Sequence, residues 1–505
     1  MTGQKVFKLN EYRKKVKKAP GLEPLDSRGG RGRSPVPPGR LKAFLWERKW
    51  LLLALLLTVF ICLSPTPRGL TVHGQYALGL WVFVIICFLT EALPLPMTAM
   101  IIGCYQVFTG IAGFRDVPGT FMDDAVIFIM GVLMMGAMLM KYNIHNRVAL
   151  FVLKLCGTRI ERVILGIVTF CALSAGFLTE HAAVMIMLPI GVGLVSLSGG
   201  YKKVPNLAKL IMLSIAYGVM IGSVSAPSGG ARNALMLGFL SSLGIDVGYG
   251  QWMVMVLPFT LLMIPIVSYW LLNLFPPEIK DLAGAIRAIR EEMEADGPMT
   301  SRAWMALAIF LAVVAGWIVA SRRYGVGNIA MAGMLLAVVL RLTDWSYLQQ
   351  KTQWGVVLLY AGAISMGKML ITTGAASWLA GQILHLAAAA EVTEGVPLLA
   401  VTATVTALVT NTMADGPTVA VLGPIFLKVA ELSRTSLVAI GVGTSLASAF
   451  SYLLVIATPA NAIVYGPGFL RAHDFLKAGA VLFLISLVLT AVFLGGFWWH
   501  VLGVW

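Results

Sequence analysis

Apolar runs of roughly 17 to 25 residues recur from about Trp46 to the end of this 505-residue chain, and each run can cross a hydrocarbon core of about 30 Å as a helix. A bilayer offers no other partner to backbone N–H and C=O groups, so runs that cross it must be helical. The chain is 58% hydrophobic and 12% charged, which excludes a water-soluble domain of this length. The sequence therefore predicts an all-α polytopic membrane protein.

Eleven of these runs are predicted to be transmembrane spans, and two further apolar stretches do not fit as ordinary spans. The spans lie near residues 46–63, 76–92, 95–113, 125–141, 206–241, 252–275, 304–321, 327–342, 354–371, 436–468 and 476–500. The two other stretches are 163–197 and 396–427. The predicted organisation is a basic tail (1–45), a first span and loop (46–75), a first repeat (76–275), an amphipathic cytoplasmic connection (276–303) and a second repeat (304–505).

Charge is concentrated at the N-terminus. The formal net charge is +15, and residues 1–45 carry a large share of the Lys and Arg. This tail has no platform of aromatic and basic residues, so we expect no nucleic-acid partner, and its Gly, Pro and Ser content predicts disorder. No signal peptide is expected, because the start is basic and polar. The positive-inside rule predicts a cytoplasmic N-terminus in a multi-pass protein of the inner or plasma membrane, although Arg322 and Arg323 then fall outside and count against this topology.

The two halves of the chain repeat one pattern. "IMGVLMMGAML" from Ile129 and "YAGAISMGKML" from Tyr360 share glycines at the same offsets. Farther on, each half has a break of small residues and proline that ends in asparagine, at Asn233 and at Asn461. The matching elements lie on the fourth and ninth spans, so the halves would be inverted relative to the membrane. Inverted repeats with paired breaks are typical of secondary transporters with a site near the midplane.

The first stretch, 163–197, contains Glu180 near its centre and no other carboxylate. Its arms, Val163–Phe177 and Ala182–Leu197, would be roughly 22 to 24 Å long at 1.5 Å per residue, which is short for a full crossing. A re-entrant hairpin with a polar tip inside the membrane explains such arms. Two ordinary spans joined by a tight loop that exposes Glu180 to water remain the alternative.

The second stretch, 396–427, has still shorter predicted arms that flank "TNTMADG", with Asp415 as its one charge. A charged side chain at membrane depth costs roughly 2.5 to 3.5 kcal/mol on insertion scales, so such residues usually mark ion or substrate pathways. Glu180 and Asp415 are therefore the leading functional pair.

The breaks at 225–230 and 458–461 interrupt spans that are otherwise long enough to cross whole. Unwound backbone frees carbonyls for a cation and helix N-termini for an anion, although a packing kink would look similar. Arg232 follows the first break and would pair with an anionic substrate or with Glu180, or would snorkel to the outer interface. Lys368 is a second intramembrane cation, with either a functional or a packing role.

His181 directly follows Glu180. Adjacent side chains on a helix diverge by about 100°, so these two are not expected to form a metal-binding face. Packing and proton relay are equal alternatives for His181. The five cysteines show neither metal-type spacing nor a disulfide framework, and no cofactor is expected.

Three stretches resemble the divalent anion to sodium symporter family, the carriers of dicarboxylates, citrate and sulfate within the ion transporter superfamily. They are "LTEALPLPMTAM" from Leu89, "IAYGVMIGS" from Ile215 and "ATPANAIVYGPG" from Ala457. The resemblance covers roughly residues 76–490. It implies a homodimer whose subunits have eleven spans and two re-entrant hairpins and work by an elevator motion.

In that family, a Ser-Asn-Thr triplet at each hairpin tip binds sodium and the substrate carboxylate, and this chain departs from the pattern. The first triplet falls on Thr179, Glu180 and His181. The second falls on Ala414, Asp415 and Gly416, with a near-match four residues earlier at Thr410, Asn411 and Thr412. The resemblance implies a substrate site from Thr179, Glu180, His181, Arg232, Asn233, Thr410, Asn411, Thr412, Asp415, Thr458, Pro459 and Asn461. It implies a cation site from Glu180, Ser228, Gly229, Asn233, Ala414, Asp415, Gly416, Ala457 and Asn461.

Carboxylates in place of amides leave the coupling ion open. A protonated Glu180 would donate a hydrogen bond to an anion, so proton and anion binding would favour each other. Alternatively, Glu180 and Asp415 remain ionised and bind sodium, and Arg232 restores positive charge for the anion. We expect a secondary active transporter of small divalent anions, dicarboxylates such as succinate first, and not an enzyme. An exchanger or a sulfate or citrate carrier of the same family, and an anion channel, are the alternatives.

Overall fold

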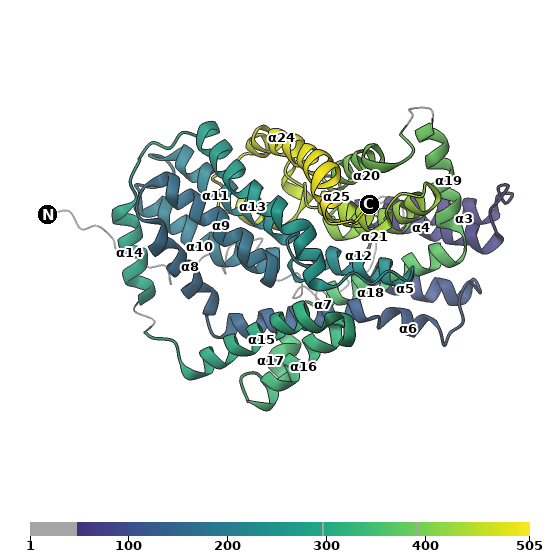
Figure 1. The fold of residues 1–505 in the computed structure, drawn as a ribbon, viewed down its shortest axis with the longest axis horizontal. Coiled ribbons are helices and arrows are strands. Elements are labelled where there is room, and N and C mark those ends of the chain that lie inside the picture. Colours follow the sequence, from purple (N-terminus) through teal and green to yellow (C-terminus); the bar gives the residue numbers. More distant parts are fainter. Residues whose placement is uncertain (1–47, 295–296, 389–391) are drawn as a thin grey trace, which may run out of the picture.

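The computed structural model describes residues 48–294, 297–388 and 392–505. Within these ranges every regular element is a helix (Figure 1). The predicted disordered tail, residues 1–45, lies outside the described residues. The fold class predicted from the apolar runs, an all-helical polytopic membrane protein, is confirmed.

The first half begins at α3, and its helices surround a broken segment. They are α3 (Lys49–Leu63), α4 (Val72–Thr90), α5 (Leu95–Phe108), α6 (Val117–Phe121), α7 (Asp124–Lys141), α8 (Ile144–Cys156), α9 (Ile160–Leu178), α10 (Glu180–Leu197), α11 (Pro205–Ser223), the short 3₁₀ helix η1 (Pro227–Gly229), α12 (Ala231–Ser242) and α13 (Tyr249–Leu274). The polar connection then forms α14 (Ala283–Glu294).

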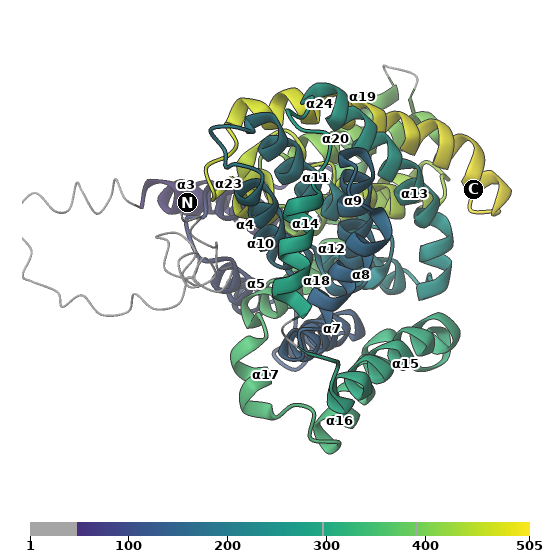
Figure 2. The same ribbon diagram turned by 90° about the vertical axis from the view of Figure 1, so that its left-hand side faces the viewer.

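The second half of the chain follows α14. Its helices are α15 (Ser301–Tyr324), α16 (Val326–Val339), α17 (Trp345–Lys351), α18 (Trp354–Thr372), α19 (Ala375–Ala388), α20 (Gly395–Thr410), α21 (Asp415–Leu432), α22 (Leu437–Ala447), the 3₁₀ helix η2 (Val455–Ala457), α23 (Pro459–Tyr465), α24 (Ala472–Val488), the π-helical η3 (Leu489–Trp498) and α25 (Trp499–Val501). Figure 2 shows α15, α16 and α17 extending below the main body of helices.

Nine helical segments of the described residues are long and apolar enough to span a membrane. Seven of them correspond to predicted spans, and the other two are α9 and α10, the arms of the first predicted hairpin. The remaining predicted spans form the shorter helices α3, α5 and α16, and the broken pair α22 and α23. The nine long segments are fewer than the eleven predicted spans because some predicted spans are broken or form short helices, which apolar composition does not reveal.

The predicted hairpin arms are longer in the structure than the sequence indicated. α9 has 19 residues, α10 has 18, α20 has 16 and α21 has 18. At 1.5 Å per residue, α9 and α10 are about 28 and 27 Å long, so the predicted 22 to 24 Å was too short. The expectation that short arms distinguish the hairpins from ordinary spans was wrong for the first hairpin, because α9 begins three residues before the predicted arm and the turn between α9 and α10 is the single residue Thr179.

The two helical hairpins, α9 with α10 and α20 with α21, start from opposite ends of the helix bundle. At the first base, Ile160 N donates to Lys280 O at 3.1 Å, just before α14. At the second base, the Ser436 hydroxyl donates to Val504 O, near the C-terminus. α13 connects these two ends. Near the start of α13, Met255 O accepts a hydrogen bond from Trp499, which lies close to the C-terminus, and the last residues of α13 lead to α14.

The connection before α14 is fastened to the base of the first hairpin. The Thr158 hydroxyl donates to the Asp281 carboxylate at 2.7 Å, and an isolated antiparallel bridge joins Arg159 to Asp281. The Thr158 hydroxyl bond and the Ala283 N–H bond stabilise the carboxylate and lower the pKa of Asp281. α14 thus lies beside α8 and α10 at one edge of the molecule (Figure 1).

The two repeated glycine motifs make matching helix contacts. A Cβ on Gly131 of α7 would lie 2.5 Å from Ala330 Cβ of α16, and one on Gly362 of α18 would lie 2.6 Å from Ala99 Cβ of α5. Small residues allow this close approach between helices that no hydrophobic effect drives together inside a bilayer. The fourth and ninth predicted spans therefore each use a glycine of the shared motif to pack closely against a helix from the other half of the chain.

Candidate functional site

The tips of the two hairpins meet at one arginine. Arg232, the second residue of α12, forms an ion pair with the Asp415 carboxylate, and its Nη1 lies 3.6 Å from Glu180 Oε2. All three residues are buried, with 1%, 8% and 5% of their surfaces exposed, respectively. Glu180 and Asp415, which the sequence predicts to be the leading functional residues, thus face the same guanidinium.

Equivalent positions supply the two carboxylates. Glu180 is the first residue of α10 and Asp415 is the first residue of α21, so each begins the returning arm of its hairpin. A negative charge at a helix N-terminus is stabilised by the unpaired N–H groups there. Asp415 Oδ1 accepts a hydrogen bond from Gly416 N at 2.7 Å. Two helix N-termini thus point their positive ends at the cluster.

The first tip holds a strained backbone. Thr179 has φ 103° and ψ 149°, a region that is essentially restricted to glycine, and a β-branched residue there costs on the order of 1 to 3 kcal/mol. Such strain persists only where the surrounding contacts fix the conformation. The strain at Thr179 marks the turn that aims Glu180 at Arg232.

The guanidinium has further contacts inside the protein. Arg232 Nη2 donates to the Ser223 hydroxyl at the end of α11, and its Nε is buried without a partner among the described residues. The alternative in which Arg232 snorkels to an interface is wrong, because its side chain is enclosed. The alternative in which it pairs with Glu180 is confirmed, and Asp415 is its additional partner.

His181 and Tyr360 border this cluster. His181 Nδ1 lies 3.9 Å from Glu180 Oε1, closer than the divergence of adjacent helical side chains suggested, and about a third of the His181 side chain (35%) is exposed. A Cβ on Gly416 would lie 2.0 Å from the Tyr360 hydroxyl, so that hydroxyl lies against the second tip. Among the described residues, no group of three His, Cys, Asp or Glu side chains could hold a metal ion.

The two breaks share one hydrogen-bond pattern. Asn233 Nδ2 donates to the carbonyls ten and seven residues earlier, those of Ser223 and Ala226. Asn461 Nδ2 donates to the carbonyls at the same offsets, those of Ser451 and Leu454. Each asparagine therefore closes the break that precedes it.

The oxygens of these asparagines differ. Asn233 Oδ1 accepts from the Ser445 hydroxyl at 2.9 Å. Asn461 Oδ1 and the nearby Ser451 Oγ are buried with no hydrogen-bond partner in the described part of the chain. A buried unpaired oxygen costs roughly 1 to 3 kcal/mol unless something binds it. The second break therefore has two oxygens available to a ligand, and the first break has Arg232 beside it.

Other predicted site residues make structural contacts around the breaks. Ser228 Oγ donates to Gly176 O of α9 at 3.0 Å, and a Cβ on Gly229 would lie 2.5 Å from Ser223 O, so only glycine fits there. Thr458 Oγ1 accepts from Asn461 N at 3.2 Å and caps α23, which begins at Pro459. Ala457 ends η2, and Ala414 precedes α21.

The near-match triplet joins the second hairpin to the second break. Thr410 Oγ1 donates to Ser448 O at 2.7 Å. Asn411 Nδ2 donates to Phe450 O and its Oδ1 accepts from Leu453 N. Thr412 is exposed and donates to its own turn at Val409 O. The hydrogen-bonding groups of Asn411 are thus used by the backbone of the break.

Lys368 lies away from the cluster. Its Nζ donates to Asp123 Oδ2 at 2.7 Å, which links α18 to the start of α7. The sequence singled out Lys368 as a charge within an apolar segment, but it did not indicate which residue Lys368 contacts. Conversely, sequence reasoning missed Ser223, Ser445 and Tyr360, whose only signal was a polar group within an apolar segment.

The whole helical region of the chain is similar to known membrane proteins. Residues 45–505 match the family model described as the sodium:sulfate symporter transmembrane region. A protein of Cupriavidus necator named only as a membrane protein is 25% identical, over 89% of this chain and 92% of its own length. The sodium-dependent dicarboxylate transporter SdcS of Staphylococcus saprophyticus is 24% identical, over 87% and 89%.

Solved structures show the same fold. The Alcanivorax borkumensis YdaH transporter matches with a TM-score of 0.55 at 15% identity, covering 92% of this chain and 99% of that chain. Neisseria gonorrhoeae MtrF, which is described as illuminating a class of antimetabolite efflux pumps, matches with a TM-score of 0.53 at 13% identity, covering 91% of this chain and 96% of that chain. These two likenesses concern the fold. Because the family model covers nearly the whole chain, the protein belongs to the sodium:sulfate symporter family, a family of sodium-coupled anion transporters and not of enzymes.

Proposed function

We propose that this protein carries small dicarboxylates across the membrane together with a cation, and that Arg232 binds the substrate. The meeting of both hairpin tips at Arg232 supports this proposal most strongly. A guanidinium presents several N–H donors in a plane that matches a carboxylate. The name of the staphylococcal relative SdcS agrees with the dicarboxylate class.

The proposed architecture is a pair of inverted repeats with re-entrant hairpins. Hairpins that begin at opposite ends and touch at their tips each stop partway through the molecule, which supports a site near the membrane midplane. The paired breaks and the matching glycine contacts support the repeat. The proposal retains a cytoplasmic N-terminus, a homodimer and an elevator motion, as the family resemblance implies.

Charge balance requires a cation. One guanidinium faces two carboxylates, so the cluster is formally one negative charge when all three groups are ionised. A dianion must displace at least one carboxylate from Arg232, and the displaced charge then repels it unless a cation neutralises it. Glu180 faces Arg232 and His181, the guanidinium also faces Asp415, and the Tyr360 hydroxyl lies nearby. Within the cluster itself, protonation of Glu180 would neutralise the displaced negative charge.

Sodium has a separate place in the proposal. Asn461 Oδ1 and Ser451 Oγ at the second break are oxygen ligands of the kind that hard cations prefer, and neither has another partner in the described chain. Arg232 supplies fixed positive charge at the first break. We therefore assign sodium to the second break.

Replacing Ser451 by alanine tests the sodium site. The hydroxyl makes no hydrogen bond among the described residues, so the Ser451→Ala protein should fold as before. Loss of a sodium ligand should raise the sodium concentration for half-maximal uptake about tenfold, or about 1.4 kcal/mol. Ser198→Ala, which removes another unpaired hydroxyl at the end of α10, should leave sodium dependence unchanged. Equal sodium curves for both variants would contradict the assignment.

The function itself is tested by uptake of labelled succinate into proteoliposomes under separately imposed sodium and proton gradients. An inward sodium gradient should drive saturable accumulation, and an inward proton gradient added to it should increase accumulation further. Glu180→Gln, which stays uncharged, should keep sodium-driven uptake and lose the proton effect. If sulfate or citrate accumulates and succinate does not, the dicarboxylate assignment fails; flux that neither saturates nor needs a cation would indicate a channel.

A further inference from the structure

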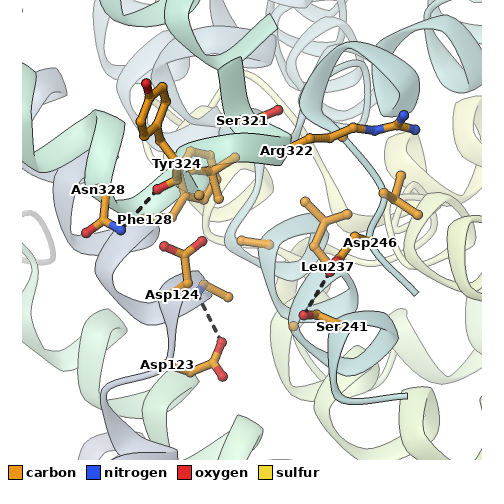
Figure 3. A pocket seen from close by; sticks show the side chains of 17 residues that line it. Asp123, Asp124, Phe128, Leu237, Ser241, Asp246, Ser321, Arg322, Tyr324 and Asn328 are labelled. Atoms are coloured by element: carbon orange, nitrogen blue, oxygen red, sulfur yellow. Dashed lines mark hydrogen bonds between the residues drawn. The ribbon is translucent and has the colours of Figure 1, made fainter. Parts of the chain in front are cut away.

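A polar cavity of about 390 Å³ is lined by the starts of α7, α13 and α16 and by the ends of α12 and α15, and Figure 3 shows its lining side chains. It lies at the end of the molecule opposite α14, because α14 follows the end of α13 and precedes the start of α15. At roughly 30 Å³ per molecule, it has room for on the order of ten waters. The proposed function does not use this cavity.

The charged groups of the cavity already have partners. Asp123 binds Lys368, and Asp124 Oδ1 accepts from Gly327 N at 3.1 Å. Asp246 accepts from the Ser241 hydroxyl at 3.2 Å, and Arg322 donates to Gln251 at 2.6 Å. Paired charges make the cavity wettable without forming a dedicated binding site.

The cavity follows one face of α12 toward Arg232. Ala234, Leu237, Gly238 and Ser241 line it, and their spacing of three and four residues places them on the same side of the helix. Ala234 is two residues from Arg232, or about 3 Å along the helix axis, and side chains at this spacing point about 200° apart. The cavity therefore extends along α12 to the level of Arg232, on the other face of that helix.

Phe128 separates this cavity from the first tip. A second, much smaller cavity of about 20 Å³ is lined by Thr179, Pro227, Ser228 and Ala231, and Phe128 lines both cavities. The Phe128 side chain, 1% exposed, fills the space between them. On one side of it lies the open cavity, and on the other lie the tip and the break.

Trp317 of α15 holds Phe128 in place, and a chain of contacts links Trp317 to α13, the first break and the first hairpin. Its ring packs edge-on against Trp317 of α15 with centroids 5.1 Å apart, and Trp317 stacks on Tyr249 of α13 at 5.2 Å. The Tyr249 hydroxyl lies 2.7 Å from Ser228 Oγ, which in turn donates to Gly176 of the first hairpin. The aromatic cluster of Phe128, Trp317 and Tyr249 is thus connected to the break and the hairpin that would move with substrate.

We propose that the cavity is an entry vestibule and that Phe128, held by Trp317 and Tyr249, is the partition that closes the Arg232 site from it. The inference rests on the proposed location of the substrate site at Arg232. Solutes from this end reach the tips when Phe128 moves aside, and a shift of Ser228 or of the first hairpin would be transmitted to Phe128 through Tyr249 and then Trp317.

Thiol labelling of α12 tests the partition independently of transport. Leu237→Cys would lie in the vestibule and Ala231→Cys would lie behind Phe128. Each full-length variant is treated with a membrane-impermeant cationic methanethiosulfonate in right-side-out and in inside-out vesicles, and labelling of the parent chain with its five native cysteines is subtracted. The side that labels Leu237→Cys is the side on which the vestibule opens, and the two rates are compared there.

Ala231→Cys should react at least tenfold more slowly than Leu237→Cys. Adding Phe128→Ala should raise its rate at least tenfold, and Phe128→Leu should raise it less. Phe83→Ala, which removes a buried ring of α4 far from the cavity, should not raise it. An unchanged Leu237→Cys rate shows that the vestibule is intact in each variant.

Two results would overturn the inference. One is equal labelling of the two positions with Phe128 present. The other is slow labelling of Ala231→Cys that persists in Phe128→Ala while Leu237→Cys still reacts. Because labelling needs no substrate, these results remain distinct from a failure of succinate uptake.

Discussion

Arg232→Gln should abolish succinate uptake and lower the thermal unfolding midpoint of the carrier. The change leaves Glu180 and Asp415 buried with no positive charge between them. Removing one partner of a buried ion pair typically destabilises a protein by about 3 to 5 kcal/mol, because the remaining charge is uncompensated. The fall in stability is measured by thermal unfolding in detergent, and the loss of uptake is measured in proteoliposomes under a sodium gradient.

A triple variant separates charge compensation from substrate binding. Arg232→Gln combined with Glu180→Gln and Asp415→Asn removes all three charges and replaces both carboxylates by amides of the same shape, so stability should recover toward that of the unmodified protein. Uptake should stay absent, because no guanidinium remains for the dianion. Arg232→Lys keeps the charge but has no planar fork to face two carboxylates, and should show intermediate loss. Uptake restored in the triple variant would exclude Arg232 as the substrate ligand.

Gly222→Ala should also strongly destabilise the protein. A Cβ on Gly222 of α11 would lie 2.1 Å from the carbonyl oxygen and 2.3 Å from the Cα of Ala172 in α9. These are backbone atoms, so rotation of a side chain cannot relieve the overlap and the helices must separate. Overpacking in a filled core typically costs about 1 to 3 kcal/mol, and a backbone clash lies at or above the upper end. α9 carries the first hairpin, so uptake should fall with stability.

The matched control for this prediction is Gly381→Ala in α19. A Cβ on Gly381 meets no atom within 4 Å, and alanine favours a helix over glycine by about 1 kcal/mol. This variant should unfold at the same temperature as the unmodified protein or higher, with normal uptake. Equal unfolding midpoints for Gly222→Ala and Gly381→Ala would show that α9 and α11 tolerate separation and would contradict the packing argument.

Sequence reasoning identified the members of the cluster because each charge conflicts with its apolar surroundings. Glu180 and Asp415 are lone carboxylates in long apolar runs, and the cost of burying a charge in a membrane makes such positions stand out one at a time. The break asparagines were found from repetition, and their identical hydrogen-bond offsets agree with the predicted repeat. Arg232 remained undecided because its local sequence fits a buried ion pair and a snorkelling side chain equally.

Hydrophobicity along the chain determines that this protein is an all-helical membrane protein, because the cost of placing polar groups in a bilayer depends on local composition. Repetition along the chain predicts two related halves. The tertiary structure alone decided which charges meet. Arg232 and Asp415 are 183 positions apart, and only the packing of two hairpins from opposite ends brings them into contact. Packing likewise brings Lys368 to Asp123, because side-chain contacts between distant segments leave no periodic pattern in either segment.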